Sequence, residues 1–282
     1  MRGLREIAGV RSLADRFDQF VVDQYGVLHD GTVPYPGATD ALAHLRQAGK
    51  AVLLLSNSGR RSRSNEERLV RLGFEAGSWS HFLSSGEVAW RHLAAKIEAR
   101  PATERLRCLL VSREGDRSAV EGLALDLVAE ARDAEIVLIA GSDGDRVDMD
   151  HYRRLLEPAA AAGVPCLCTN PDKLMLVREG TRFGAGRIAE TYAAMGGPVT
   201  WIGKPHAEIY DAAMHMLGQP PATSVVCIGD SIEHDIAGGQ SMGLPTALVA
   251  TGILDGASSE QKEELFAAHG ARPDYLLPSF VW

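Results

Sequence analysis

Short apolar runs, each ended by glycine or polar residues, recur along the chain and are separated by segments long enough to hold a helix. Residues 20–22 and 51–55 form the first two runs, and residues 225–228 and 246–250 form the last two. The apolar residues within a run are consecutive rather than alternating, which is typical of strands covered on both faces of a sheet. The pattern therefore predicts an α/β fold built on a doubly wound, mostly parallel sheet.

Helical periodicity fills the segments between several of these runs. Residues 64–73 begin with a capping box of Ser64 and Glu67 and reach Gly73, a residue type that often ends helices. Residues 206–218 place their apolar side chains along one stripe. Both segments predict helices that connect neighbouring strands.

The length of the chain favours two domains. A chain of 282 residues is longer than one compact core usually holds. The interval between the apolar runs at 51–55 and 199–202 contains strands and helices of its own, which is enough material for a second domain. We therefore predict a core domain of residues 1–83 and 178–282, interrupted by an inserted α/β domain at residues 84–177.

Composition excludes several classes of partner. Asp and Glu outnumber Lys and Arg by 37 to 29, and the net charge of −8 disfavours binding to a nucleic-acid backbone. No apolar stretch approaches the ~18 residues of a membrane span, and residues 1–20 lack an apolar signal segment. We expect a cytoplasmic protein with neither a nucleic-acid nor a membrane partner, and the sequence leaves open whether it forms a homo-oligomer.

The four cysteines lie in or beside apolar runs, where small buried hydrophobic residues are expected. Cys166 and Cys168 are close in sequence, but no second pair completes a zinc site. The cysteines are therefore predicted to pack in the interior.

Carboxylates, hydroxyls and one ammonium group follow four of the apolar runs. In parallel sheets the binding crevice lies beyond the carboxyl ends of the strands, so residues from different runs are expected to meet there. Such a set suits phosphoryl transfer, which needs a nucleophile, a positive charge and donors that hold the phosphoryl oxygens. The residues concerned are Asp23, Ser56, Asn57, Ser58, Lys204, Asp230 and Asp235.

Each of these residue types fits one task in such a reaction. Asp23 is the candidate nucleophile, because a carboxylate that attacks phosphorus forms an aspartyl-phosphate that water can later open. Asp230 and Asp235 are candidate ligands of Mg²⁺, which prefers hard oxygen donors and commonly takes one or two carboxylates. Lys204 supplies a positive charge, while Ser56 and the backbone N–H groups that follow it supply hydrogen bonds.

The order of these residues resembles the haloacid dehalogenase-like (HAD) superfamily, specifically the phosphatases of its subclass IIA, over nearly the whole chain. The resemblance implies a Rossmann-like core with a large cap domain inserted between the second and third motifs. It also implies Mg²⁺ as the cofactor and small phosphorylated metabolites as substrates, either sugar phosphates or nucleotide-like phosphomonoesters. The matching segments are VVDQYGVLHDG (21–31), LLLSNSGRR (53–61), WIGKPHAEIYDAA (201–213) and CIGDSIEHDIAGG (227–239), with CTNPDKL (168–174) and GAGRIAETYAAMGG (184–197) as further similarities.

The resemblance implies roles for individual residues. Asp23 corresponds to the nucleophile and, together with the backbone carbonyl of Tyr25, to a ligand of Mg²⁺. Asn170 and Asp172 of the NPD turn correspond to positions where the cap approaches the substrate. The implied phosphate-binding residues are Ser56, Asn57, Ser58 and Lys204, and the implied acidic metal positions are Asp230 and Asp235.

Tyr25 departs from the superfamily pattern, in which a second Asp protonates the leaving oxygen and then activates water. A tyrosine with an ordinary pKa of about 10 is a weaker acid and base near neutrality. Either the substrate has a good leaving group or another residue supplies the proton, and the histidines near the motifs are candidates. These histidines are His29, His206 and His234.

Tyr25 also admits two alternatives to a phosphatase. One is a haloacid dehalogenase-type C–halogen hydrolase, in which the halide leaves without a proton, but such enzymes work without metal and have little use for paired carboxylates. The other is a slow or inactive protein that binds phosphorylated ligands. The intact nucleophile, lysine and acidic pair favour retained phosphatase chemistry.

Overall fold

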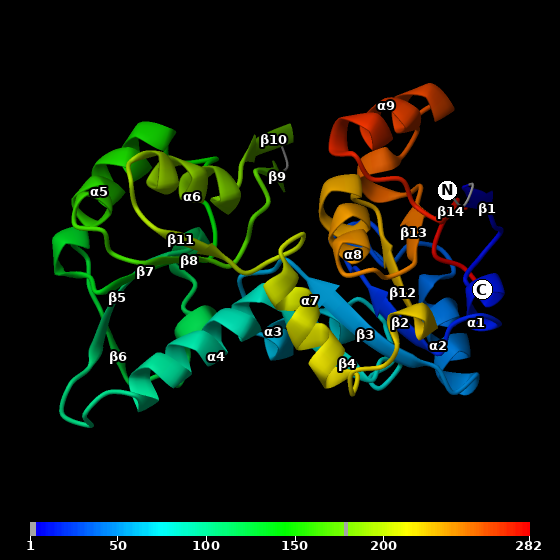
Figure 1. The fold of residues 1–282 in the computed structure, drawn as a ribbon, viewed down its shortest axis with the longest axis horizontal. Coiled ribbons are helices and arrows are strands. Elements are labelled where there is room, and N and C mark those ends of the chain that lie inside the picture. The colour runs from blue at the N-terminus through cyan, green and yellow to red at the C-terminus, as the bar shows by residue number, and fades with distance from the viewer. Residues whose placement is uncertain (1–3, 178–179) are drawn as a thin grey trace. The chain divides into compact units, whose positions relative to one another are not determined.

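The computed structural model describes residues 4–177 and 180–282, which form two compact units (Figure 1). Unit 1 contains Met1–Ser56, Glu66–Leu83 and Lys204–Trp282, and unit 2 contains Asn57–Asn65 and Ser84–Gly203. Each unit has its own sheet, and the predicted α/β class with parallel strands is confirmed.

Unit 1 is built on a seven-stranded sheet in the order β1-β14-β13-β12-β2-β3-β4. Strand β2 lies between β12 and β3 and runs parallel to both, with Val22 opposite Ile228 and Leu54. This order brings strands that are distant in sequence side by side. The strands are β1 (Arg5–Glu6), β2 (Gln19–Val22), β3 (Ala51–Ser56), β4 (His81–Ser84), β12 (Val225–Gly229), β13 (Thr246–Val249) and β14 (Tyr275–Leu277).

The helices of unit 1 connect these strands, and both faces of the sheet are buried. Phe20 and Val22 of β2 share one apolar cluster with Leu42 of α2, while Val21 between them points to the other face and is also buried. Coverage on both faces explains why the apolar runs are continuous, as predicted for a doubly wound sheet. The helices are α1 (Arg11–Ala14), α2 (Ala38–Gln47), α7 (Ala207–Met216), α8 (Ala237–Ser241) and α9 (Ser259–His269), and α3 (Ser62–Arg71) has residues in both units.

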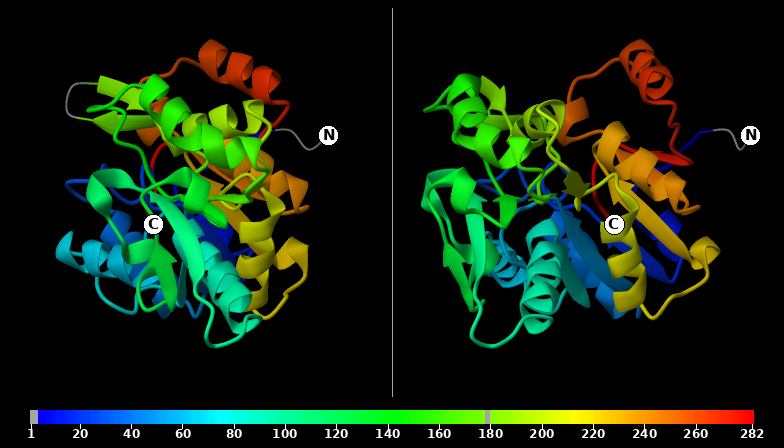
Figure 2. Two further views of the ribbon diagram at one scale, coloured as in Figure 1. Left: turned by 90° about the vertical axis from the view of Figure 1, so that its left-hand side faces the viewer. Right: turned by 60° about the vertical axis from the view of Figure 1, so that its left-hand side comes forward.

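Unit 2 has a five-stranded parallel sheet in the order β11-β8-β7-β5-β6, and β9 and β10 form a separate antiparallel pair. Val137 and Ile139 of β7 pack with Leu156 of α5 and Ile188 of α6. Figures 1 and 2 show α5 and α6 on one face of the sheet and α4 on the other. The elements are α4 (Ser85–Glu98), β5 (Leu106–Val111), β6 (Leu125–Leu127), β7 (Ile136–Ile139), α5 (Met149–Ala161), β8 (Cys166–Cys168), β9 (Leu174–Val177), β10 (Gly180–Phe183), α6 (Ala185–Ala194) and β11 (Val199–Trp201).

The limits of unit 2 differ from the predicted inserted domain at residues 84–177. Strand β11 pairs in parallel with β8, and α6 packs on the same sheet, so unit 2 extends to Gly203. Pairing with β8 gives β11 partners for its backbone hydrogen-bonding groups, which the apolar pattern of one strand does not reveal. The role of unit 2 as a cap over the substrate stays a prediction.

The cysteines are buried and unpaired, as their apolar surroundings predict. Burial alone raises the pKa of Cys108 to about 12, which makes it an inert thiol rather than a reactive thiolate. Every helix within residues 4–177 and 180–282 is too short or too polar to span a lipid bilayer.

Candidate functional site

Asp23 and Lys204 form the centre of a buried polar cluster in unit 1. Asp23 follows directly after β2, and its Oδ1 accepts a hydrogen bond from Lys204 Nζ at 2.6 Å. The same Nζ donates to Asp235 Oδ1, also at 2.6 Å. All three side chains are at most one-tenth exposed, so these charge-assisted contacts are little screened by solvent.

The acidic residues after β12 are placed by close backbone packing. Asp235 lies in a π-helical turn, Ile232–Ile236, and its Oδ2 accepts from the Ser231 N–H at 3.1 Å. Asp230 Oδ2 accepts from the Ile253 N–H at 2.9 Å. A Cβ at Gly26 would lie 2.1 Å from that same oxygen, so only glycine lets the chain pass there.

Burial and like charges shift the ionisation of this cluster. Burial raises the pKa of Asp23 to about 7, with Lys204 opposing and Asp235 adding to the shift. Burial and then Asp23 and Asp235 also raise the pKa of Asp230 well above its ordinary value. Burial lowers the pKa of Lys204, but the two carboxylates outweigh this effect and hold it above its ordinary value, so Lys204 is charged.

The donor set fits a hard divalent cation. One carboxylate oxygen from each of Asp23, Asp230 and Asp235 lies within 4.8 Å of the others. Asp23 accepts from Lys204 through Oδ1, and Asp230 accepts from the Ile253 N–H through Oδ2. Three buried carboxylates beside one ammonium group carry excess negative charge, which a cation such as Mg²⁺ compensates through hard oxygen ligands.

Tyr25 lies on the loop after Asp23 with its side chain 41 % exposed. Its ring meets the His29 ring edge-on at 5.8 Å and packs against Gly31, where a Cβ would lie 2.9 Å from Tyr25 Cε2. Burial and then Asp30 raise the pKa of Tyr25, which makes the phenol an even weaker acid near neutrality. Tyr25 therefore offers a poor replacement for a carboxylic acid at this position.

Two of the histidines near the motifs, His29 and His206, are poor proton donors at neutral pH because their pKa values are lowered. His29 is fully buried, its Nδ1 accepts from the Gly31 N–H at 2.9 Å, and burial followed by Arg68 lowers its pKa to about 4. Burial and then His234 lower the pKa of His206 as well. His234 places its Nδ1 3.2 Å from Ser231 Oγ, beside the acidic turn.

Ser56, the last residue of β3, contacts a residue that the sequence pattern did not single out. Gln24 Nε2 donates to Ser56 Oγ at 2.6 Å, and both side chains are buried. Gln24 Oε1 is also buried and has no hydrogen-bond partner among the described residues. Because Gln24 directly follows Asp23, this contact connects the loop after β2 to the end of β3. In the sequence, the one sign of this role was that Gln24 carries an amide just after an apolar run. Many turn residues have the same position and chemistry, so Gln24 did not stand out.

The other predicted phosphate-binding and cap residues are grouped in unit 2. Asn57 Nδ2 donates to Asp172 Oδ1 at 2.8 Å, and the Asp172 N–H donates to Asn170 Oδ1 at 3.0 Å. Ser58 accepts at its Oγ from the Arg60 N–H and at its carbonyl from the Gly86 N–H. Asn57, Asn170 and Asp172 thus form one hydrogen-bonded group.

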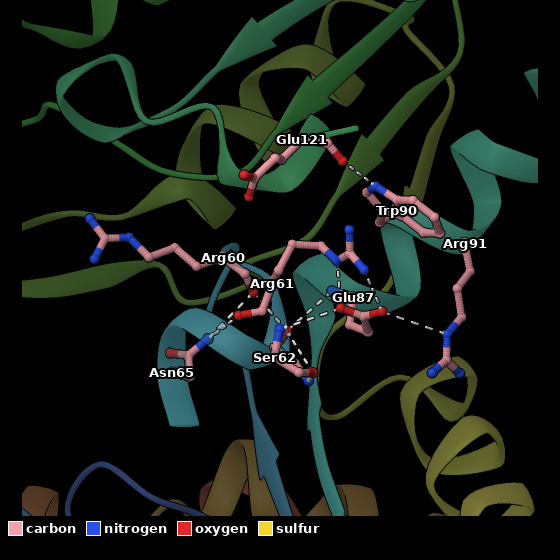
Figure 3. A network of polar contacts seen from close by, with 9 residues as sticks. Arg60, Arg61, Ser62, Asn65, Glu87, Trp90, Arg91 and Glu121 are labelled. Atoms are coloured by element: carbon pink, nitrogen blue, oxygen red, sulfur yellow. Dashed lines mark hydrogen bonds and ion pairs between the residues drawn. The ribbon is translucent and has the colours of Figure 1, made fainter. Parts of the chain in front are cut away.

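Arg60 and Arg61, which follow Ser58 closely in sequence, bind carboxylates of unit 2. Arg61 donates from Nε and Nη2 to the two oxygens of Glu87 at 2.5 and 3.0 Å, and its guanidinium lies 4.0 Å from the centre of the Trp90 ring (Figure 3). Arg60 Nε lies 2.6 Å from Asp116 Oδ2. These contacts anchor the segment 57–65 to α4 and to the loop after β5.

The comparisons with known proteins identify the family. Family models described as haloacid dehalogenase-like hydrolase and HAD-hydrolase-like match residues 20–126 and 201–281. The sugar-phosphatase AraL of Bacillus subtilis is 30 % identical over 92 % of this chain and 89 % of its own length. The chain belongs to the HAD superfamily. Within that superfamily it is a phosphatase of subclass IIA, as the motifs indicated.

Two further similarities extend over nearly all of this HAD phosphatase. Chronophin of Bos taurus is 29 % identical over 97 % of this chain and 94 % of its own length. The crystal structure of a haloacid dehalogenase-like hydrolase from Brucella suis matches with a TM-score of 0.82 at 26 % identity, covering 98 % of this chain and 100 % of that one. The sequence and the fold therefore agree on a hydrolase of phosphoric monoesters.

Proposed function

We propose that this HAD phosphatase is Mg²⁺-dependent and hydrolyses small phosphorylated metabolites through an aspartyl-phosphate on Asp23. The observation that carries the proposal is the buried hydrogen bond from Lys204 to Asp23, within a cluster that also holds Asp230 and Asp235. The lysine binds one carboxylate oxygen, Oδ1, and thereby orients the carboxylate. The relative AraL is named a sugar-phosphatase, which supports sugar phosphates as the substrate class.

The proposed covalent steps need only the chain, the substrate and water. An oxygen of Asp23 attacks phosphorus, the bond from phosphorus to the leaving oxygen breaks, and the leaving oxygen takes up a proton from water. A second water then attacks the aspartyl-phosphate and gives its proton to the hydroxide left by the first, which releases inorganic phosphate and restores the Asp23 carboxylate. Lys204 neutralises phosphoryl oxygens, and the donors of the phosphate-binding loop hold them. Those loop residues are Ser56, Asn57 and Ser58.

The same proposal assigns the cation and the cap. Asp23, Asp230, Asp235 and the Tyr25 carbonyl hold Mg²⁺, which when bound neutralises charge on the phosphoryl oxygens. Unit 2 acts as the cap that selects the organic part of the substrate. That Asn170 and Asp172 approach the substrate stays a prediction.

Tyr25 is the observation that keeps a second candidate, a slow or inactive protein that binds phosphorylated ligands. Its phenol replaces the expected acid and base, and such groups typically contribute on the order of 10² to 10⁴ in rate. A stable phosphorylated Asp23, detected by mass spectrometry without release of phosphate, would favour this candidate. The dehalogenase alternative gains no support, because the relatives are phosphatases and the carboxylate cluster suits a metal.

The proposed function is tested by screening phosphorylated metabolites and p-nitrophenyl phosphate for phosphate release with Mg²⁺. We expect EDTA and the substitution Asp23→Asn each to abolish release. Asp145→Asn is the matched control, because Asp145 pairs with Arg113 in unit 2 and takes no part in the cluster. Turnover that survives both EDTA and Asp23→Asn would contradict the mechanism.

A further inference from the structure

We propose that Asp172 is a positioning residue for the phosphate-binding loop: it holds Asn57 and thereby fixes the neighbouring Ser56. The inference rests on the proposed phosphatase function. It gives Asp172 a task that is independent of the organic part of the substrate.

The hydrogen bond from Asn57 to Asp172 joins two segments that are far apart in sequence. Asn57 Nδ2 lies 2.8 Å from Asp172 Oδ1, and Asn57 is buried. A carboxylate acceptor makes such a bond stronger than one between neutral groups. The carboxylate is itself held by a local turn, because the Asp172 N–H donates to Asn170 Oδ1 at 3.0 Å. Asp172 therefore offers Asn57 an acceptor whose backbone is already fixed.

Gly203 packs against the oxygen of the Asn57 side-chain amide. A Cβ at Gly203 would lie 2.7 Å from Asn57 Oδ1 and 2.4 Å from Pro171 Cδ, closer than real side chains approach. The amide of Asn57 thus lies between the carboxylate of Asp172 and the bare Cα of Gly203. This arrangement leaves the side chain little freedom to turn.

The turn that carries Asp172 is packed just as tightly against the start of α6. A Cβ at Gly184 would lie 2.1 Å from the Asp172 carbonyl oxygen, and one at Gly186 would lie 2.0 Å from that of Pro171. The Gly184 N–H and Gly186 N–H donate to the carbonyls of Lys173 and Asp172. Residues 170–172 are therefore a rigid support within unit 2.

Two proposed phosphate-binding residues are covalent neighbours of the residues held in this way. Ser56 precedes Asn57, and Lys204 follows Gly203. Ser56 is additionally held at its hydroxyl by Gln24, the residue after Asp23. Phosphoryl transfer depends on reacting groups that are held to a fraction of an ångström. Greater freedom of Asn57 should therefore lower the rate, because it changes the position of the neighbouring Ser56.

The rest of the loop has separate anchors, which makes the effect of Asp172 specific. Arg61 is held by Glu87 and Trp90 (Figure 3), and Arg60 is held by Asp116. Removing the Asp172 carboxylate therefore removes one anchor at the end of the loop next to Ser56 and leaves the anchors of Arg60 and Arg61 in place.

The test compares Asp172→Ala and Asp172→Asn on p-nitrophenyl phosphate, glycerol 3-phosphate and a hexose phosphate. We expect Asp172→Ala to lower kcat/KM by about tenfold or more, as the loss of one hydrogen bond to a charged acceptor predicts. The factor should be the same for all three substrates, and inhibition by inorganic phosphate should weaken in parallel. Asp172→Asn should recover most of the loss, because its amide oxygen still accepts from Asn57.

Asp116→Ala is the matched control, since it removes a carboxylate that anchors the same loop farther from Ser56. A loss confined to substrates with a large organic part would show substrate contact by Asp172 and overturn the inference. A fall of less than twofold, or a loss in Asp172→Asn equal to that in Asp172→Ala, would overturn it as well.

Gly203→Ala provides a second variant that leaves the carboxylate in place. The added methyl group pushes on Asn57, so the same uniform loss is expected even where Asp172→Ala does not fold. An active wild-type protein with no loss in Gly203→Ala and Asp172→Ala refutes the inference alone. A wild-type protein without phosphatase activity refutes the proposed function together with it.

Discussion

Gln24 and Tyr25, the two residues after Asp23, differ in burial and therefore in what their side chains can do. Gln24 is buried and uses its amide to hold Ser56, whereas Tyr25 is 41 % exposed and packs against His29 and Gly31. A buried amide can place a neighbouring donor, and a phenol with a raised pKa can donate a hydrogen bond but gives up its proton poorly. Both residues lead to predictions at this scale.

Tyr25→Asp should raise turnover, because a carboxyl group at this position can protonate the leaving oxygen and activate water. The gain should be larger for alkyl phosphates, by up to about 10²-fold, than for p-nitrophenyl phosphate, whose leaving group needs no proton. Initial rates on both substrates measure this difference. Tyr25→Phe is the control that removes the hydroxyl without adding an acid, and equal or lower rates for Tyr25→Asp on both substrates would contradict the prediction.

Gln24→Leu should weaken the binding of phosphorylated substrates, since Ser56 Oγ loses its buried donor. A lost hydrogen bond of about 1 kcal/mol corresponds to a roughly fivefold rise in KM. Gln19→Leu, in the preceding strand β2, is the matched control, because Gln19 also carries an amide oxygen that has no partner among the described residues. Steady-state kinetics that show the same KM for Gln24→Leu and Gln19→Leu would count against the role of Gln24.

The strand-end rule anticipated which charged residues meet. Asp23, Asp230 and Asp235 meet as expected, because they follow β2 and β12, which are neighbours in one parallel sheet. Lys204 joins them for a different reason than the rule supposed, since it follows β11, which belongs to the sheet of unit 2. Gln24 was missed because its partner is set by strand register across the sheet, which no spacing in the sequence encodes. The chemical roles of the four charged residues stay predictions until activity is measured.

At the scale of elements, the start of α4 is held by the loop that follows β3. Ser84 caps the helix by accepting from the Glu87 N–H at 3.1 Å, and the Glu87 carboxylate binds Arg61. Burial raises the pKa of Glu87, but the hydrogen bond and charge of Arg61 outweigh it and leave the pKa lowered. The ion pair therefore persists at neutral pH.

Arg61→Ala should destabilise the protein by about 2 kcal/mol, because it removes a largely buried bidentate ion pair and a cation–π contact. Arg91→Ala is the matched control on the same carboxylate. Arg91 lies 4.0 Å from Glu87 and is half exposed, so its loss should cost less than about 0.5 kcal/mol. Urea unfolding of the two variants measures the difference, and equal losses would show that burial of the pair is unimportant.

Helix boundaries show where local patterns give way to tertiary contacts. The capping box of Ser64 and Glu67 predicted a start at residue 64, but α3 begins at Ser62 and Ser64 lies inside it. Ser62 Oγ accepts from the Ser84 N–H at 3.2 Å, a contact between residues distant in sequence. The end of α3 near Gly73 was predictable, because glycine readily adopts the positive φ found there, 99°. The helix α7 was predictable from its apolar stripe, which is also a local signal.

At the scale of the whole molecule, the buried carboxylates make stability depend on pH and on metal. The pKa of Asp23 is about 7 in the folded state and near 3.8 in the unfolded chain, so the folded state binds more protons between these values. Stability therefore decreases as pH rises through this window when no cation is bound.

In EDTA, the wild-type protein should lose at most about 3–4 kcal/mol between pH 4 and pH 7 through Asp23, and Asp23→Asn should remove that loss. Added Mg²⁺ should restore stability at pH 7 in the wild type, because it binds the folded carboxylates. Thermal unfolding at several pH values measures both effects. Asp18→Asn, at an exposed ion pair with Lys50, is the control, and an identical pH profile for both variants would contradict the prediction.

Strand β11, at the edge of the unit 2 sheet, also determines where segments of this HAD phosphatase can be exchanged with those of a relative. A chimaera that exchanges residues 84–177 would separate β8 from β11 and would leave α6 without the sheet that buries Ile188 and Tyr192. An exchange of residues 84–203 transfers the complete sheet and should give the more soluble hybrid. Because that graft ends at the glycine before Lys204, each donor brings its own backbone to the proposed catalytic residue Lys204. If unit 2 selects the substrate as proposed, substrate preference and the placement of Lys204 would be inherited together.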